Sequence, residues 1–328
     1  MNDEIPGLTR KRWGKGFIYF NEKHEKIRDS NALKRLKKLV IPPIWENVWI
    51  SPLENSHLQS TGIDLKKRKQ YLYHPDWINY RQKMKFHKMV EFGKSLSKIR
   101  IAYQDFLKES EWTKKKVIAL VIYLLDNYYF RIGNIQYTQE NESYGITTLR
   151  RKHLQEEAGK LVLNYKAKSG KVRNVKIHHS KARKLIREMA ELPGYEIFRY
   201  KGDDHKFHKL DSQDINEFLQ VIGGREFSAK DFRTWGASKL ALELYNHAVE
   251  EISQNPRLKF ETTLVRNVAK KMGNTISVCR TYYIHPAVLN YVQIQFPQPL
   301  LLSKEINLPH MDIFEILLMK IIAVSNPN

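Results

Sequence analysis

Residues 273–286 read GNTISVCRTYYIHP, with two adjacent tyrosines, Tyr282 and Tyr283, just ahead of a His-Pro step. A tyrosine hydroxyl is a weak nucleophile at neutral pH because its unperturbed pKa is about 10. Cations crowded around the ring can turn the same hydroxyl into a nucleophile that forms a covalent intermediate. The alternative interpretation is that both rings pack in a core, as most aromatic side chains do. The choice between these two interpretations depends on the other residues of the chain.

The chain of 328 residues is strongly basic, with 56 Lys and Arg against 35 Asp and Glu and a formal net charge of +21. The length predicts about two domains, and residues 1–80 and the remainder both carry a positive excess. Such an excess indicates a polyanionic partner, either nucleic acid or an anionic membrane surface. The longest apolar candidate, residues 313–324, is interrupted by Glu315 and Lys320 and falls short of the roughly 18 residues of a spanning helix. The pattern therefore favours nucleic acid.

Cysteine usage and the first residues indicate the compartment. Cys279 is the only cysteine, so no disulfide can form within the chain, and we interpret it as a small buried apolar side chain. A chain without disulfides is typical of a reducing cytoplasm. Residues 1–6 are polar and acidic and lack the apolar core of a signal peptide. We therefore expect a cytoplasmic protein.

Residues 1–75 are predicted to form a small β-rich domain. Short strand-like runs occur at residues 16–20, 48–51, 57–60 and 70–73, separated by Pro, Asn and Gly. A polar turn around residues 21–24 is expected to fold the first run into a hairpin. A short helix is expected over residues 31–39, with Asn31 as its cap.

A cationic cluster in this domain is followed by aromatic residues at strand spacing. The cluster consists of Lys66, Lys67, Arg68 and Lys69. Tyr71 and Tyr73 come next and would project from one face of a strand. Basic side chains beside aromatic rings suit a surface that meets phosphates and bases. The other interpretation is a solvated charge run beside ordinary strand aromatics, and the residues alone leave both open.

Residues 76–328 are predicted to be mainly helical. Apolar residues recur at three- and four-residue spacing over 77–109 and 113–130, and the chain is helical again from Lys181 to about residue 292. Between about 148 and 177 the pattern returns to strands around a tight turn at residues 168–171, which predicts an embedded β-hairpin. The tail, residues 296–328, contains prolines and then an apolar helix from about 311, and its role is left open.

Five separated motifs along the chain combine into one pattern. They are the RIGN run at 131–134, Lys168 in the tight turn, Lys230 and Arg233 three residues apart, Asn274, and the tyrosine pair. Lys230 and Arg233 would share one face if the segment is helical. In this order the motifs closely resemble the type IB DNA topoisomerases, in particular the small form found in poxviruses and bacteria. The resemblance runs from about residue 13 to residue 286.

The resemblance implies a set of site residues by position. The catalytic residues would be Arg131, Lys168, Arg233, Asn274 and Tyr283, with Lys230 supporting proton transfer or binding phosphate. In the family the nucleophile lies nine residues beyond an Asn or His position, which selects Tyr283 over Tyr282. The expected DNA contacts are Gln70, Tyr71, Tyr73 and Tyr137, together with the cationic cluster.

Phosphate chemistry agrees with these roles. Attack on a phosphodiester builds negative charge on the non-bridging oxygens, and fixed cationic donors stabilise that charge. A guanidinium presents a planar fork that matches phosphate geometry, so we expect Arg131 and Arg233 to hold those oxygens, with Asn274 adding a neutral hydrogen bond. Lys168 is the best candidate for the general acid that protonates the departing 5′-oxygen.

The resemblance further implies relaxation of supercoiled DNA through a 3′-phosphotyrosyl intermediate, strand rotation and religation. Bond energy stays in the phosphotyrosine, so no cofactor is expected, neither ATP nor a metal ion. The implied fold is α+β: a small N-terminal β-rich domain and a larger, mainly α-helical catalytic domain with an embedded β-hairpin, forming a clamp around double-stranded DNA. We expect a monomer that does not bind membranes and that associates with the nucleoid in a bacterium.

Two other classes of DNA-binding protein share part of the pattern. Tyrosine recombinases use similar chemistry, but they usually carry a His three residues before the second Arg, where this chain has Lys230. They also typically have a helical domain in place of the β-rich one. A non-enzymatic architectural protein would use the charge and leave the motifs unexplained. The run Asp203, Asp204 and His205, with His208, could hold a metal ion, but we expect a polar loop there.

Overall fold

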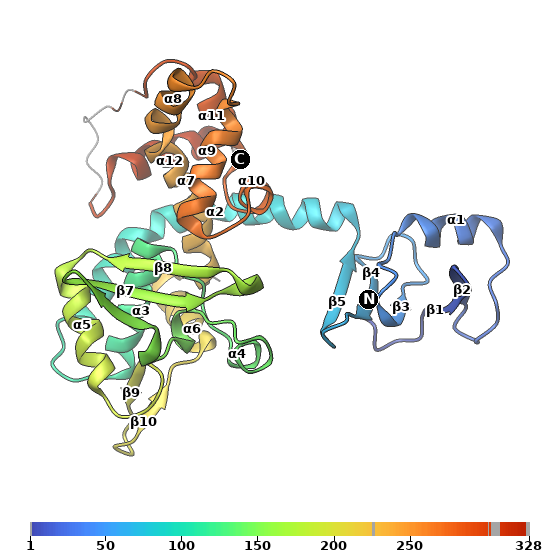
Figure 1. Cartoon of the computed structure of the whole chain (residues 1–328), viewed down its shortest axis with the longest axis horizontal. Coiled ribbons are helices and arrows are strands. Elements are labelled where there is room, and N and C mark those ends of the chain that lie inside the picture. Colours follow the sequence, from blue (N-terminus) through green and yellow to red (C-terminus); the bar gives the residue numbers. More distant parts are fainter. Residues whose placement is uncertain (1, 225–226, 301, 303–308, 326–328) are drawn as a thin grey trace. The chain divides into compact units, whose positions relative to one another are not determined.

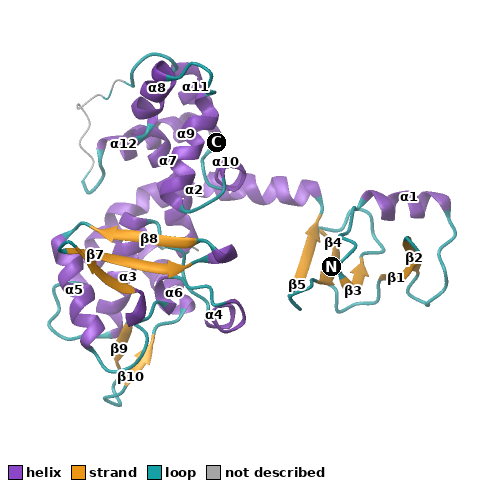
Figure 2. Cartoon of the chain, viewed as in Figure 1, coloured by secondary structure: helices purple, strands orange, loops and turns teal. Residues whose placement is uncertain are grey.

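The computed structural model describes residues 2–224, 227–300, 302 and 309–325. The chain divides into two compact units, Met1–Lys85 and Phe86–Asn328, and the division falls within the long helix α2 (Pro75–Phe106). The fold is α+β, with a sheet in the first unit and mostly helices in the second (Figure 2). Among the described residues, no helix is both long and apolar enough to span a membrane.

The first unit is a five-stranded antiparallel sheet with one helix. The strands are β1 (Leu8–Trp13), β2 (Gly16–Phe20), β3 (Glu46–Ile50), β4 (Leu58–Ile63) and β5 (Lys69–Tyr73), in the order β2-β1-β3-β4-β5. Leu36 of α1 (Ser30–Lys38) packs in one core with Tyr19, Val48 and Ile50 from the sheet. The prediction of a small β-rich N-terminal domain is confirmed.

Of two local predictions in this unit, the turn after β2 is confirmed in part and the helix cap was wrong. Strand β2 pairs with β1, so the hairpin turn is at Gly14 and Lys15, where Gly14 adopts a positive φ of 56°. The polar run after β2 does turn the chain back, because the Asn21 amide donates to the Glu25 carbonyl at 2.9 Å and Phe20 and Lys26 form an antiparallel bridge, but the next described element is α1 and not a strand. The helix α1 is capped by Asp29, whose carboxylate accepts a hydrogen bond from the Ala32 amide at 2.7 Å, and not by Asn31. Polar residues that lie close together at the start of a helix offer equivalent caps, and tertiary packing selects one.

The second unit is mainly helical, as predicted. Its helices after α2 are α3 (Lys114–Tyr128), α4 (Ile135–Asn141), α5 (Ser180–Glu191), α6 (Ser212–Gly223), α7 (Ala229–Glu243), α8 (Tyr245–Gln254), α9 (Phe260–Met272), α10 (Ile276–Tyr282), α11 (Pro286–Gln295) and α12 (Ile313–Ser325). The embedded sheet has three antiparallel strands, β6 (Leu154–Glu157), β7 (Lys160–Lys166) and β8 (Val172–Ile177), and Figure 1 shows β7 beside β8.

A second, smaller hairpin replaces the loop expected around residues 203–208. Strands β9 (Arg199–Lys201) and β10 (Phe207–Lys209) pair across a turn. His205 takes a positive φ of 60° in this turn, and the Asp204 carboxylate lies 2.8 Å from the His208 ring nitrogen. Each strand has only three residues, which is too short for an alternating pattern to reveal.

Helix α7 is the centre of this unit and is buried along most of its length. It contacts α3, α6, α9, α11 and α12. The ring of Tyr129 lies against Gly236, where an added Cβ would come within 2.3 Å of the ring. This close approach needs glycine, and it fixes the end of α3 against the middle of α7.

The tail helix α12 is joined to this centre by a buried ionic network. The guanidinium of Arg100 pairs with Asp126 at 2.8 Å and with Glu315 at 2.7 Å. Glu315 also accepts a hydrogen bond from the indole of Trp235 at 3.0 Å. Lys239 of α7 pairs with the carboxylate of Asp312, which lies just before α12. A buried charge is tolerated when its partners satisfy it, and here the partners tie α12 to α2, α3 and α7.

Candidate active site

Arg233 extends from α7 into the core and is only 3% exposed. Its guanidinium donates hydrogen bonds to the carbonyl of Tyr129, to the carbonyl of Met272 at 3.1 Å, and to Oδ1 of Asn274 at 3.1 Å. Tyr129 is the left-handed residue that ends α3, with φ of 56°, and Met272 is the last residue of α9. Arg233 therefore links the ends of two helices to the helix that carries it.

Asn274 is positioned by the way in which α9 ends. Gly273 adopts a φ of 64°, and its amide donates to the Lys270 carbonyl at 3.3 Å. The backbone N–H of Asn274 donates to the Ala269 carbonyl at 2.9 Å, which completes a Schellman motif. Glycine is the residue that takes this conformation without strain. The Gly-Asn pair in the sequence thus ends the helix and directs the Asn274 side chain toward the arginines.

Arg131 meets the same turn from the other side. It lies shortly after α3 and is half-buried. Its guanidinium donates to the Gly273 carbonyl at 3.1 Å and to Oδ1 of Asn274. A single amide oxygen therefore accepts from both Arg131 and Arg233, and it holds these two cations side by side.

A third arginine, Arg173, completes the cluster and was not predicted from the sequence. It lies on β8, is buried, and donates to the same Met272 carbonyl as Arg233. An added Cβ on Gly273 would come within 2.4 Å of its guanidinium. The strand VRNVKI places residue 173 on the same side as the buried Val175 and Ile177. An arginine at an inward strand position was the signal that could have found it.

The three arginines form an uncompensated positive centre. Within the described residues, none of Arg131, Arg173 and Arg233 pairs with a carboxylate. Burial, and then the charge of Arg233, lowers the pKa of Arg131 to about 10, so its guanidinium is still charged at neutral pH. Two buried nitrogens also have no hydrogen-bond partner among the described residues: Nδ2 of Asn274 and Nε of Arg233. Unpaired donors and like charges at one place favour an anion.

Tyr283 faces this centre, immediately after the seven-residue helix α10. Helix α10 begins at a Thr275 cap, and Tyr283 follows its last residue, so the spacing from Asn274 corresponds to about two helical turns. The Arg233 guanidinium carbon lies 5.2 Å from the centre of the Tyr283 ring. Tyr282 is the last residue of α10 and is 43% exposed.

The electrostatics of this arrangement act on the Tyr283 hydroxyl. Burial raises its pKa, but the charge and hydrogen bonding of Arg233 lower it, and the charges of Arg131 and Lys230 lower it further. The net result is a pKa below the ordinary value of 10.0. A larger fraction of the hydroxyl is therefore ionised near neutral pH than in a free tyrosine.

Cys279 is buried, and burial raises the pKa of its thiol to about 11, which makes it unreactive.

The two lysines expected in the site are both exposed. Lys168 lies in the turn between β7 and β8, where Ser169 and Gly170 adopt φ values of 64° and 74°. Among the described residues, the Lys168 side chain makes no hydrogen bond or ion pair. Lys230 is exposed at the start of α7, one turn before Arg233. The structure thus brings Arg131, Arg233, Asn274 and Tyr283 together and leaves both lysines open to solvent.

The DNA contacts expected in the first unit are divided between the two faces of β5. The rings of Tyr71 and Tyr73 stack at 6.1 Å on the same face, and both are exposed. Gln70 is on the other face, where its amide donates to Asp64 at 2.9 Å. In the cationic cluster, Lys67 pairs with Glu46, Arg68 with Asp64 and Lys69 with Asp3, while Lys66 is exposed. The side chain of Tyr137 lies outside the described part of the structure.

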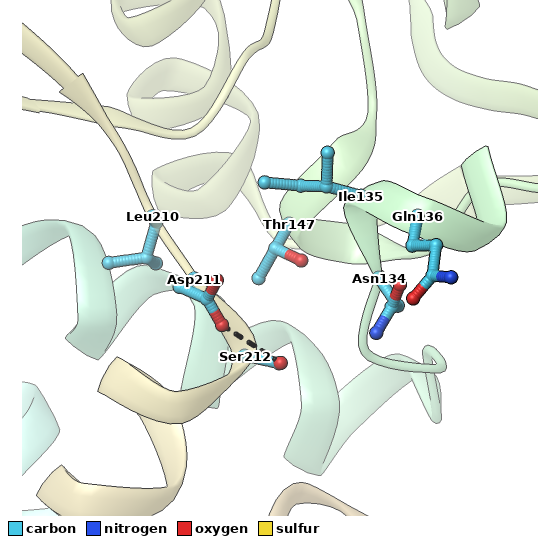
Figure 3. Close-up of a pocket in the computed structure, with 8 residues that line it drawn as sticks. Asn134, Ile135, Gln136, Thr147, Leu210, Asp211 and Ser212 are labelled. Atoms are coloured by element: carbon cyan, nitrogen blue, oxygen red, sulfur yellow. Dashed lines mark hydrogen bonds between the residues drawn. The ribbon is translucent and has the colours of Figure 1, made fainter. Parts of the chain in front are cut away.

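A small cavity of about 190 Å³ lies beside the RIGN segment (Figure 3). It is lined by Gly133, Asn134, Ile135, Gln136, Thr147, Leu210, Asp211 and Ser212. Asp211 caps α6 and accepts a hydrogen bond from the Ser212 hydroxyl at 3.0 Å. None of the three arginines lines this cavity, and its carboxylate disfavours a phosphate there. Of the two places, the arginine cluster is the candidate anion site.

Comparison with known proteins identifies the family. A family model described as eukaryotic DNA topoisomerase I, catalytic core, matches residues 67–297, and one described as bacterial DNA topoisomerase IB, N-terminal domain, matches residues 16–64. The DNA topoisomerase 1B of Acanthamoeba polyphaga mimivirus is 31% identical over 294 residues, which cover 88% of this chain and 86% of the viral protein.

More distant relatives agree. The DNA topoisomerase 1B of Vaccinia virus (strain Copenhagen) is 24% identical over 272 residues, which cover 81% of this chain and 83% of the viral protein. The DNA topoisomerase 1 of Drosophila melanogaster is 28% identical over 205 residues, which cover 60% of this chain and 19% of the insect protein. The prediction of a topoisomerase, and not a recombinase or an architectural protein, is confirmed. This chain belongs to the type IB DNA topoisomerases, and its activity is that of a DNA topoisomerase IB.

Proposed function

We propose that the chain relaxes supercoiled DNA by transesterification, with Tyr283 as the nucleophile and a 3′-phosphotyrosyl intermediate. The observation that carries the proposal is the position of Tyr283 over Arg233, next to Arg131 and Asn274. The cations lower the pKa of the hydroxyl that attacks and can also hold the anion under attack. Both effects lower the free-energy barrier to attack on the phosphodiester.

The proposed transesterification exchanges one phosphoester bond for another. The Tyr283 Oη forms a bond to phosphorus, the bond from phosphorus to the 5′-oxygen breaks, and the phenolic proton leaves to solvent. The guanidinium groups of Arg131 and Arg233 hold the two non-bridging oxygens as charge builds on them. The Nδ2 of Asn274, which is unpartnered among the described residues, donates a neutral hydrogen bond to one of them. Religation runs the same steps backwards after the duplex rotates.

Lys168 is proposed as the general acid that protonates the 5′-oxygen as it departs. Support comes from its place in the chain. Burial raises the pKa of Tyr165, three residues before it, and the charges of Arg173, Arg233 and Arg131 oppose that rise, so this end of β7 is within range of the arginines. Lys168 is exposed in the turn that follows β7, from which it would protonate the leaving group of a bound strand. Lys230, whose charge acts on Tyr283, is proposed as a supporting residue for proton transfer or phosphate binding.

The substrate is double-stranded DNA, as the family implies. We further propose that residues 1–75 serve as a DNA-binding domain and residues 76–328 as the catalytic domain, and that the two together enclose the duplex. Lys69, Tyr71 and Tyr73 are the proposed contacts on the outer face of β5, which is the face that carries the two exposed tyrosine rings. The protein would act as a cytoplasmic monomer, and the chemistry assigned to these residues has no step that calls for ATP or a metal ion.

Relaxation of a supercoiled plasmid by Tyr283→Phe and Tyr282→Phe variants tests the assignment. The Tyr283→Phe protein should be inactive, and the Tyr282→Phe protein, its matched neighbour control, should relax DNA at close to the normal rate. Stopping the wild-type reaction with denaturant should trap a protein–DNA adduct on the 3′ end of the broken strand and leave a free 5′-hydroxyl. Relaxation by Tyr283→Phe, or an adduct on the 5′ end, would show that the proposed chemistry is wrong.

A further inference from the structure

The outer face of the five-stranded sheet is covered in part by residues 2–7, here called the N-terminal strap. Cross-strand partners share a face, and the register pairs Trp49 with Thr61 and Thr61 with Tyr71. Lys69 and Tyr73 lie on this face as well, two residues from Tyr71 on either side. The intervening Leu72 packs on the opposite face against the core.

The N-terminal strap is held on this face by specific contacts. The indole nitrogen of Trp49 donates to the Ile5 carbonyl at 3.0 Å, and the Thr61 hydroxyl donates to the Asp3 carboxylate at 2.8 Å. An added Cβ on Gly7 would come within 2.2 Å of the Trp49 ring. Glycine at this position therefore allows the backbone to lie flat against the ring.

The strap places a carboxylate at the position where the proposed DNA surface has its cation. The Nζ of Lys69 lies 2.6 Å from the Asp3 carboxylate, and the two side chains are 46% and 15% exposed. The same Nζ is 5.7 Å from the centre of the exposed Tyr71 ring. The hydrogen bond between them lowers the pKa of Asp3 and raises that of Lys69, so both are charged at neutral pH. An anionic oxygen next to a lysine and an aromatic ring is the arrangement that a DNA phosphate would make there.

We propose that Asp3 occupies the position of a DNA phosphate on Lys69 in the free protein, and that duplex DNA displaces it when it binds this face. The proposal rests on the proposed function, in which Lys69 and Tyr71 contact DNA. Because the Asp3 carboxylate and a phosphate compete for one ammonium group, the strap weakens DNA binding. It also neutralises the charge of Lys69 until a polyanion binds.

The test measures the affinity of the full chain for a short duplex by fluorescence anisotropy at low salt. In Asp3→Asn, the Thr61 hydroxyl can still donate to the side-chain oxygen, so the strap stays in place and only the charge is lost. The matched control is Glu4→Gln, which removes the same charge one residue away, where the carboxylate accepts a hydrogen bond from Asn2. Asp3→Asn should bind DNA about two- to fivefold more tightly than Glu4→Gln, as expected for release of one exposed ion pair.

A second comparison separates this proposal from the one on which it rests. Lys69→Gln and Tyr71→Ala should each weaken DNA binding, and Asp3→Asn should give no gain when combined with Lys69→Gln. If neither single variant weakens binding, the outer face does not contact DNA and the assigned DNA surface fails. If both weaken binding but Asp3→Asn and Glu4→Gln bind equally, the surface stands and the strap proposal is overturned. The difference between the two strap variants should shrink as salt rises, because exposed charges are screened.

Discussion

Replacing Arg173 by Met should slow formation of the covalent adduct while leaving DNA affinity nearly unchanged. Arg173 is buried on β8 and shares the Met272 carbonyl with Arg233, and it lies against Gly273 in the turn that positions Asn274. Its role in this geometry is to hold the turn and to add one positive charge beside Arg131. Methionine fills a similar volume but provides neither the hydrogen bond nor the charge.

The size of the effect follows from the bond that is lost. A hydrogen bond from a charged donor is worth about 1.5–3 kcal/mol, and each 1.36 kcal/mol corresponds to a factor of about ten in rate. If the turn holds the reacting geometry, Arg173→Met should lower the rate of adduct formation about 10- to 150-fold. The Arg173→Lys variant keeps the charge and one donor, so it should recover most of the loss.

The assay is single-turnover adduct formation on a labelled duplex, with enzyme in excess of DNA and above the measured Kd. Thermal unfolding provides the control for folding, because Arg173→Met also changes a buried side chain and a loss of stability must be separated from a loss of rate. An Arg173→Met protein that is folded and forms the adduct at the wild-type rate would refute the role. A variant that loses affinity but not rate would refute it equally, since Arg173 would then act as a DNA contact.

Three further predictions follow from the same structure. Arg233→Gln should slow adduct formation about 10²- to 10³-fold and shift the rising limb of the pH–rate profile to higher pH, because the charge of Arg233 lowers the pKa of Tyr283; an unshifted limb would contradict this. In urea unfolding, Gly273→Ala should be more destabilising than Gly224→Ala. Both glycines have a positive φ, which costs a residue with a side chain about 1–2 kcal/mol, but only at Gly273 would the added Cβ also clash with a neighbour. Equal losses of unfolding free energy would contradict the clash. Glu315→Gln should reduce the free energy of unfolding at pH 7 by about 3–5 kcal/mol. Burial raises the pKa of Glu315 but its ion pairs lower it further, to below 4.5, so its contribution is present above that pH, and wild type and variant should converge as the pH falls below it.

The catalytic residues were predicted from the resemblance to the family, and local sequence patterns predicted the elements that carry them. Asn274 and Tyr283 are separated by one short helix with a cap at Thr275, and Arg233 is on a helix with a regular pattern. The strand-turn-strand pattern around Lys168 is likewise confined to one stretch of chain. Local periodicity predicts such elements, and here it predicted the mainly helical second unit, but it did not by itself assign the catalytic residues.

The features that were missed depend on contacts between distant segments. Arg173 joins the active-site cluster through a carbonyl that is 99 residues further along the chain. The Arg100 and Glu315 pair spans 215 residues, so the role of the tail helix could not be inferred from its own pattern. Strand β1 was not predicted, and β2 pairs with it across the turn at Gly14 and Lys15 within a sheet that also contains distant strands. Such choices are made by tertiary packing, which a single sequence does not display.

The hydrogen bonds to Asn274 have a consequence for how the enzyme responds to acidity. Its amide oxygen accepts from Arg131 and Arg233 at once, and an amide neither gains nor loses a proton between pH 5 and 8. An imidazole at this position would accept from an arginine only while neutral, and protonation near pH 6.5 would add a further cation beside the arginines. In this chain the spacing of the two guanidinium groups is therefore insensitive to mild acid. Any pH dependence of cleavage then reports on the groups that transfer protons and not on the assembly of the anion site.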